Sequence, residues 1–470
     1  MNMAARLPMD RAAPAALLLL VLPCLAAAQS GLRPVEAVAD EYIRVALTSN
    51  LALQGQQLEV ARATEALAAA RARFLPEIAL QARYTRADGG REIEFPVGTL
   101  LNPAYQTLNE LLVAQGQPPR FSPLPDISIP FQREREQDTR ITLRQPLYQP
   151  AIPAAVRAQQ ALLRGTNAAE QALVAQLRRD VYLAYLNWLK ALRARTLLGS
   201  SAQVLEENLR VNESLLRNGR ITQDQVLRAQ TEQLAMTQQL REASSAIDQA
   251  RSYVNFLLNR PLGTPLEEAR DTIEDVVTPE PAAITAAGGR PEVQQLDAFA
   301  AAADAQQQVA ASALRPSVSL GVDVGTQGSS WHLGPGYNFA TASVVLSWKF
   351  FDGGANRAEA QRAALAARKA RLQQQQLMQQ IELETQQARD RLSESIDSLA
   401  VAESRAEAAR AALFIAQRKR DAGSISQVEF LDARSAQTAA DLSLIGTRFE
   451  LLQRRVELQY ATGDLQGTVP

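Results

Sequence analysis

Residues 355–422 decide the fold, and they read ANRAEAQRAALAARKARLQQQQLMQQIELETQQARDRLSESIDSLAVAESRAEAARAALFIAQRKRDA. The run contains neither proline nor glycine, the two residues that most often end a helix. Residues 154–218 form a second run without proline, and Gly165 and Gly199 are its only glycines. At ~1.5 Å per residue, each run predicts a helix approaching 100 Å, which favours a coiled coil over a compact domain.

A third run, which begins after Gly219, carries the apolar seam of a helical bundle. Apolar residues separated by three or four positions form one stripe along a helix, and alanine in that stripe lets neighbouring helices approach closely. The stripe predicts long helices packed side by side. Its members are Leu240, Ala243, Ile247, Ala250, Val254 and Leu257.

The landmarks of the chain occur twice in the same order. Residues 74–80, 143–148 and 218–223 match residues 314–320, 346–351 and 422–427, with displacements of 240, 203 and 204 positions. The drop from 240 to 203 leaves 37 extra residues in the first half, within the proline-rich stretch 86–137. Such self-similarity predicts one unit used twice, in residues 29–259 and 291–470, joined by a linker over residues 260–290.

Each unit contains two short runs in which apolar and polar residues alternate. They span residues 77–85 and 139–148 in the first unit, and residues 317–325 and 340–350 in the second. A period of two predicts strands with one apolar and one polar face, and ~9–11 residues suffice for a tilted strand to cross a membrane. A half-buried sheet of a soluble domain shows the same alternation, but the long helices beside these strands favour the membrane interpretation.

Four strands cannot close a membrane sheet, because unpaired backbone groups are costly in hydrocarbon. The sequence therefore predicts an oligomer with eight, twelve or sixteen strands from two, three or four copies. Aromatic residues near the strand ends are typical of the girdles at membrane interfaces. They are Tyr148, Trp331, Tyr337, Trp348 and Phe351.

The first 28 residues predict a secretory signal peptide. Arg6 and Arg11 precede the apolar run 15–22, and the small residues 26–28 place the cleavage site after Ala28. An alternative is a lipoprotein acylated at Cys24, which Pro23 disfavours because a small residue is required there.

The composition excludes most kinds of chemistry. The 470 residues carry 49 basic and 50 acidic side chains, and a net charge of −1 gives no indication of nucleic-acid binding. Cys24 is the only cysteine and His332 the only histidine, which excludes Cys/His zinc sites, Cys–His nucleophiles and disulfides. We therefore expect no enzymatic activity and no cofactor.

The signal peptide, the duplicated helix–hairpin–helix unit, the long helices and the glycine turns together resemble the TolC family of outer-membrane efflux proteins. The likeness is strongest in residues 218–221 with 226–229, and 422–425 with 430–433. It implies an α+β membrane protein, a homotrimer with a twelve-stranded barrel in the outer membrane and a tunnel of twelve helices across the periplasm. Residues 86–137 would then form a long extracellular insertion. It also implies the exit duct of a tripartite efflux or type I secretion system. Its partners would be a periplasmic adaptor, an inner-membrane transporter (RND, ABC or MFS type) and outer-membrane lipid.

The resemblance further implies that the two helix-reversing turns dock the adaptor. Gly219 and Gly423 lie where the helices reverse, and a plainer interpretation is that they only permit the positive φ of such turns. The predicted docking residues are Asn218, Gly219, Arg220, Ile221, Ala422, Gly423, Ser424 and Ile425.

Acidic residues near the tips resemble the periplasmic gate of the family. Glu429 and Asp432 stand three apart on one helix face, and Asp224 lies near the corresponding place in the first unit. In a trimer, the pair would form a ring of six carboxylates that favours cations. A solvated helix face is the plainer interpretation, and Ile425 occupies the place where the family often has a basic partner.

Two other classes of protein fit part of these observations. A periplasmic coiled-coil adaptor would have long hairpins but no barrel, and the strand pairs argue against it. An envelope scaffold without a pore would share the architecture, and a conductance measurement would distinguish it.

Overall fold

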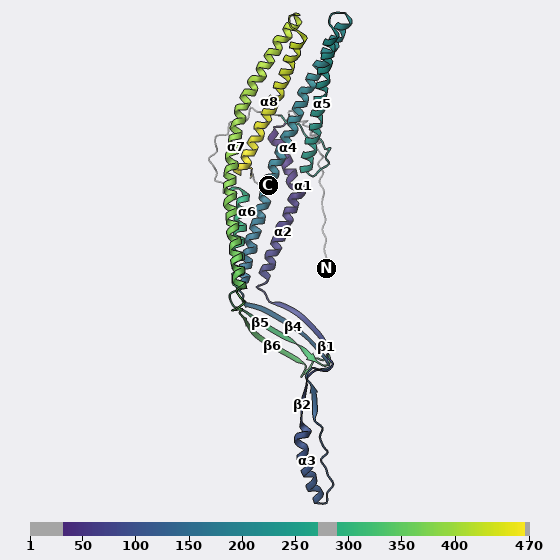
Figure 1. Cartoon of the computed structure of the whole chain (residues 1–470), viewed down its shortest axis with the longest axis vertical. Helices are drawn as coiled ribbons and strands as arrows, with labels where there is room; N and C mark the ends of the chain where they lie inside the picture. Colours follow the sequence, from purple (N-terminus) through teal and green to yellow (C-terminus); the bar gives the residue numbers. More distant parts are fainter. Residues whose placement is uncertain (1–31, 271–288, 466–470) are drawn as a thin grey trace, which may run out of the picture.

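The computed structural model describes residues 32–270 and 289–465. The predicted signal peptide and Cys24 lie outside these residues, as does the 271–288 part of the predicted linker. Figure 1 shows an elongated molecule in which a bundle of helices, a sheet and a slender arm follow one another along the long axis.

Seven helices form the described part of the bundle. The two longest, α4 and α7, have 67 residues each and confirm the two long helices predicted from the sequence. The predicted seam on α5 is half-buried at its start and buried at its end. The helices are α1 (Val35–Ser49), α2 (Leu51–Ala72), α4 (Ala151–Arg217), α5 (Gln223–Leu257), α6 (Pro291–Ser312), α7 (Ala355–Asp421) and α8 (Gln427–Thr462).

The main core lies midway along the bundle, where α1, α4, α5 and α8 meet. Tyr185 and Leu189 of α4 are fully buried there with Val38 of α1 and Val254 of α5. The Tyr185 hydroxyl donates to the backbone oxygen of Glu267 at 2.8 Å. The described part of the predicted linker therefore packs against the middle of the helices.

Small residues let α4 and α6 approach closely. A side chain at Gly165 of α4 would meet the ring of Phe299 at 2.5 Å, so only glycine fits at this crossing. Alanines fill the buried positions of α6 around the same contact.

The sheet has four antiparallel strands in the order β1-β4-β5-β6. Three of them confirm the predicted runs with longer bounds, but the fourth ends at residue 347 rather than 350. Trp348 lies beyond it, where its indole N–H donates to the Leu314 oxygen at 3.2 Å, so the residues after 347 turn toward the helices instead of extending the ladder. The strands are β1 (Glu77–Arg86), β4 (Arg135–Tyr148), β5 (Ser317–Gly328) and β6 (Asn338–Ser347).

The predicted extracellular insertion 86–137 is more ordered than its prolines suggested. It holds β2 (Glu92–Phe95), the 18-residue helix α3 (Val97–Ala114) and β3 (Ile127–Pro130), and β4 already begins at Arg135. Helix α3 forms despite Pro103 because its apolar residues recur at helical spacing. Together these elements form the arm at the far end of the sheet (Figure 1).

Among the described residues, no helix combines the length and the apolar character needed to cross a membrane.

Candidate functional site at the helical tips

Two helix-reversing turns lie at the same end of the molecule, opposite the sheet (Figure 1). The first joins α4 to α5 through residues 218–222, and the second joins α7 to α8 through residues 422–426. The structure therefore places the eight predicted docking residues in two hairpin tips at one end. All of them are exposed except Ile221 and Ile425, which are half-buried.

Both turns have the same backbone geometry. Gly219 has a φ of 67° and Gly423 a φ of 72°, in the left-handed region that favours glycine. The Arg220 N–H donates to the Leu215 oxygen at 2.9 Å, and the Ser424 N–H donates to the Lys419 oxygen at the same distance. These are Schellman-type helix ends, which satisfy carbonyls that the last turn would otherwise leave unpaired.

Conformation alone requires the two glycines. A side chain at either position would meet no atom within 4 Å, so no close contact excludes alanine. Among the described residues, the space directly beside each glycine is therefore open.

Glu429 and Asp432 lie in the first two turns of α8, and both are exposed. The Glu429 N–H donates to the Ser426 hydroxyl oxygen at 3.2 Å, which caps the helix. Asp224 lies in the first turn of α5, on the other hairpin, and is also exposed. Within residues 32–270 and 289–465, no ion pair involves any of the three, and no acidic cluster could hold a metal ion.

Behind the tips, a small apolar cluster joins the two hairpins. Phe430 and Leu431 of α8 are buried against Leu205 of α4 and Leu413 of α7. The guanidinium of Arg420 lies 4.0 Å from the centroid of the Phe430 ring. The cluster fixes the position of Asp432, which follows directly in the sequence.

A half-buried arginine between the two hairpins was not predicted from the sequence. Arg434 of α8 lines a cavity of about 130 Å³ with residues of α4 and α5. Burial lowers the pKa of Arg434, and the nearby Asp441 carboxylate opposes this shift. Asp441 in turn pairs with Arg410 of α7 at 2.6 Å. Nothing in the sequence separates Arg434 from the many solvated arginines on the same helices.

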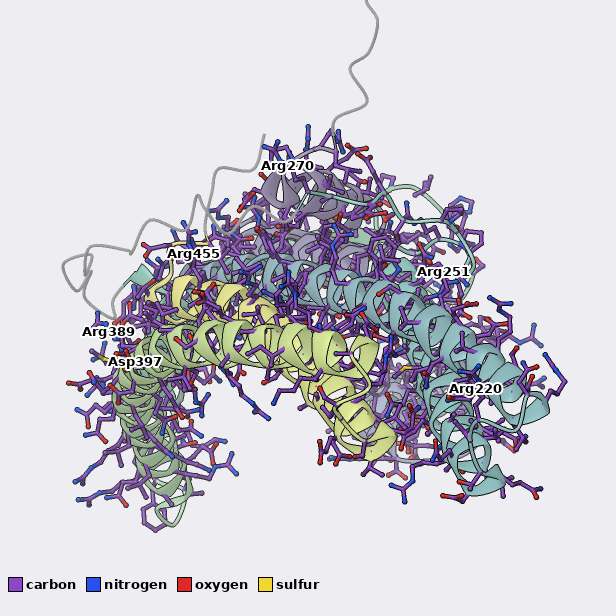
Figure 2. The ribbon with its side chains drawn as sticks, turned by 90° about the horizontal axis from the view of Figure 1, so that it is seen from above. Arg220, Arg251, Arg270, Arg389, Asp397 and Arg455 are labelled. Atoms are coloured by element: carbon purple, nitrogen blue, oxygen red, sulfur yellow. The ribbon has the colours of Figure 1, made fainter. Side chains whose placement is uncertain are left out.

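Seen from the tip end, the helices form a curved layer and not a closed ring (Figure 2). Arg389 and Asp397 of α7 lie at one end of this layer, and Arg220 beside α5 lies at the other. The helices of one chain therefore follow part of an arc.

Residues 285–464 match the family model described as outer membrane efflux protein. No curated protein matches the chain by sequence.

Solved outer-membrane channels share its fold over most of their length. The outer-membrane channel OprN is 18% identical with a TM-score of 0.75, and the match covers 92% of this chain and 91% of OprN. CusC is 16% identical with a TM-score of 0.76, over 91% of this chain and 92% of CusC. The Campylobacter jejuni outer-membrane channel CmeC is 16% identical with a TM-score of 0.76, over 92% of this chain and 87% of CmeC. Residues 285–464 are therefore similar to the outer membrane efflux protein family, and the chain as a whole has the fold of these outer-membrane channels.

Proposed function

We propose that this protein is the exit duct of a tripartite efflux or type I secretion system, working as a homotrimer in the outer membrane. The observation that carries the proposal is the uncovered apolar face of the four-stranded sheet, at the end of two 67-residue helices. The likeness to outer-membrane channels supports it.

One face of the sheet is apolar and unprotected. Leu80, Ile141, Val324 and Ala340 lie side by side across the four strands, and all four are exposed. In water such a face would be costly, whereas in a bilayer it is the lipid-facing surface.

The opposite face of the sheet is polar. Thr142, Asp323 and Thr341 form the row next to the apolar one. On the same face, the Arg140 Nε–H donates to Asp138 at 2.9 Å. Polar and charged side chains on this face suit a water-filled lumen.

The sheet ends in two unpaired edges, β1 and β6. Because the strands alternate in direction, β6 of one copy can pair with β1 of the next and keep the sheet antiparallel. Three copies give twelve strands and remove every edge, as a membrane sheet requires.

The helices carry matching uncovered surfaces for such a ring. Leu227 and Leu234 are exposed toward the tip end of α5, at one edge of the bundle, and Phe414 and Ile415 are exposed toward the tip end of α7, at the other edge. A contact between two different surfaces of identical copies closes into a ring when the rotation permits. The curved layer in Figure 2 fits one third of that ring.

A periplasmic adaptor and an inner-membrane transporter of RND, ABC or MFS type complete the proposed system. The exposed tips at residues 218–221 and 422–425 are the proposed adaptor-docking surface.

Gly423→Ala tests the docking surface. Alanine at a φ of 72° costs about 1–2 kcal/mol locally, so the second tip should adopt another conformation while the rest of the helix persists. We expect normal trimer levels in outer-membrane fractions and reduced efflux from cells that depend on the variant. Full efflux with normal trimer levels would remove the docking proposal.

Gly199→Ala is the matched control for this change. Gly199 lies inside α4 with no atom within 4 Å of an added side chain and without a positive φ. Alanine should therefore stabilise the helix by up to about 1 kcal/mol and leave efflux unchanged.

The variant Glu429→Gln with Asp432→Asn tests the acidic gate. If six carboxylates ring the entrance, their removal should bring the cation-to-anion permeability ratio in planar bilayers close to one. Glu394→Gln with Asp397→Asn is the matched control, since these residues are also exposed and three apart on α7 but far from the tips. Unchanged selectivity and conductance in the tip variant would show that the pair forms no gate.

A further inference from the structure

We propose that the three α3 helices of the trimer pack against one another in parallel and form a three-helix cap beyond the outer end of the sheet. This inference rests on the proposed homotrimer and adds an interface that the four-stranded sheet does not require.

One side of α3 is already occupied by the chain that follows it. The Asn102 side chain accepts from the Leu124 N–H at 2.7 Å and donates to the Leu124 oxygen at 2.9 Å. Two helical turns later, the Asn109 side chain donates to the Phe121 oxygen and accepts from the N–H groups of Arg120 and Phe121. Residues 117–126 are therefore held along this side, and the orientation of the helix in the arm is fixed.

Another side of α3 is apolar and uncovered. Val97, Leu101, Ala104, Leu108 and Leu111 follow the alternating four- and three-residue spacing of a coiled-coil seam over two heptads. Val97 is half-buried and the other four are exposed. Leu100, on the flank of the same stripe, is 72% exposed. Such a stripe on a helix that has no apolar neighbour there marks a binding surface.

The charge of α3 favours another α3 helix over a lipid surface as its partner. Glu110 is the only charged residue among its 18 residues, and it lies outside the seam. Identical copies can therefore approach without strong repulsion. Amphipathic helices that bind membrane surfaces usually carry lysine or arginine on the polar side, and α3 has neither.

The ribbon that connects α3 to the sheet is also incompletely covered. Ile93 pairs with Ile129 and Phe95 pairs with Ile127, and all four side chains are exposed. A two-stranded ribbon alone is marginally stable in water, so the arm gains stability from a partner along its length.

The position of the arm in the fold would place the arms of identical copies close together. The arm follows β1 in the chain and precedes β4. Because β1 is an edge strand, it would lie at the proposed interface between copies. The arm extends away from the helical tips along the long axis (Figure 1). In a symmetric trimer, the three arms would extend in the same direction from the outer end of the barrel. Their α3 helices would therefore be parallel, as packing through the apolar stripe of α3 requires.

The test is disulfide cross-linking of Leu108→Cys in the full-length protein, purified from outer membranes in detergent. Leu108 lies in the middle of the seam, and the natural cysteine, Cys24, falls in the predicted signal peptide. We expect mild oxidation to link at most two of every three chains into dimers, because one disulfide can form about each three-fold axis. We also expect labelling of this cysteine by a maleimide to be several-fold slower than at Gln106→Cys, the exposed control on the opposite side of α3.

The outcomes separate this inference from the proposed function. A detergent-solubilised trimer with no cross-link and equal labelling rates would overturn the cap and leave the duct standing. A monomer in detergent would overturn both. Protection of Leu108→Cys that appears only in lipid vesicles, without any cross-link, would assign the surface to lipid and overturn the cap.

Discussion

Replacing Val344 with arginine should abolish accumulation of the protein in the outer membrane. Val344 lies on β6 with its side chain 67% exposed, on the same face as Leu320 of the neighbouring strand. If this face meets lipid, a buried guanidinium costs about 2–4 kcal/mol per copy near the middle of the bilayer, and a trimer carries it three times. The measurement is the amount of folded trimer in outer-membrane fractions.

Ser343→Arg is the control for this prediction. Ser343 is the adjacent residue on the same strand, is also exposed, and points to the polar face. An arginine there would enter the proposed lumen and should leave trimer levels close to normal. If Val344→Arg assembled as well as Ser343→Arg, the apolar face would not be a lipid-facing surface.

Replacing Arg290 with alanine should destabilise the protein by about 3–5 kcal/mol, because it leaves two carboxylates without their partner. Arg290 is buried at the start of α6 and pairs with Glu292 and with Glu384 of α7, each at 3.0 Å. Its guanidinium also lies 5.0 Å from the ring centroid of Tyr460 on α8. The residue therefore joins three helices, and thermal unfolding in detergent should report its loss directly.

Arg362→Ala provides the comparison for Arg290→Ala. Arg362 of α7 pairs with Glu359 but is largely exposed, so its removal should cost less than about 1 kcal/mol. Equal losses in the two variants would show that the Arg290 cluster contributes no more than a surface ion pair.

The Arg290 cluster also predicts a dependence on pH. Burial raises the pKa of Glu292, but the hydrogen bond from Arg290 and further hydrogen bonds outweigh it, and the pKa falls below its usual 4.5. A carboxyl group with a lowered pKa in the folded state stabilises the protein above its unfolded pKa and loses this contribution as the pH falls. The stability difference between wild type and Arg290→Ala should therefore shrink as the pH falls below about 4.5.

The long helices and three of the strands could be predicted because their signals are local and repeated. Freedom from proline and glycine specifies α4 and α7, and strict alternation specifies β1 and β5. The tip turns were predictable for the same reason, since Gly219 and Gly423 are isolated glycines between long helical runs.

The arm could not be predicted because its signals conflict. Pro96, Pro103 and the prolines that follow α3 indicate a loop, while the spacing from Val97 to Leu111 indicates a helix. The side-chain contacts of Asn102 and Asn109 with the returning chain resolve the conflict, and such contacts depend on tertiary structure.

The side-chain contacts between the two hairpins also could not be predicted from the sequence. Arg434 looks like its solvated neighbours in the sequence, and only the crossing of α4, α5 and α8 places it at the cavity.

The most direct test of the proposed duct is the mass and conductance of the mature protein purified from outer membranes in detergent. The proposal predicts three chains per particle and a cation-selective pore when the particle is inserted into a planar bilayer. A monomer that remains soluble without detergent would contradict it, because the apolar face of the sheet would then have to be covered within a single chain.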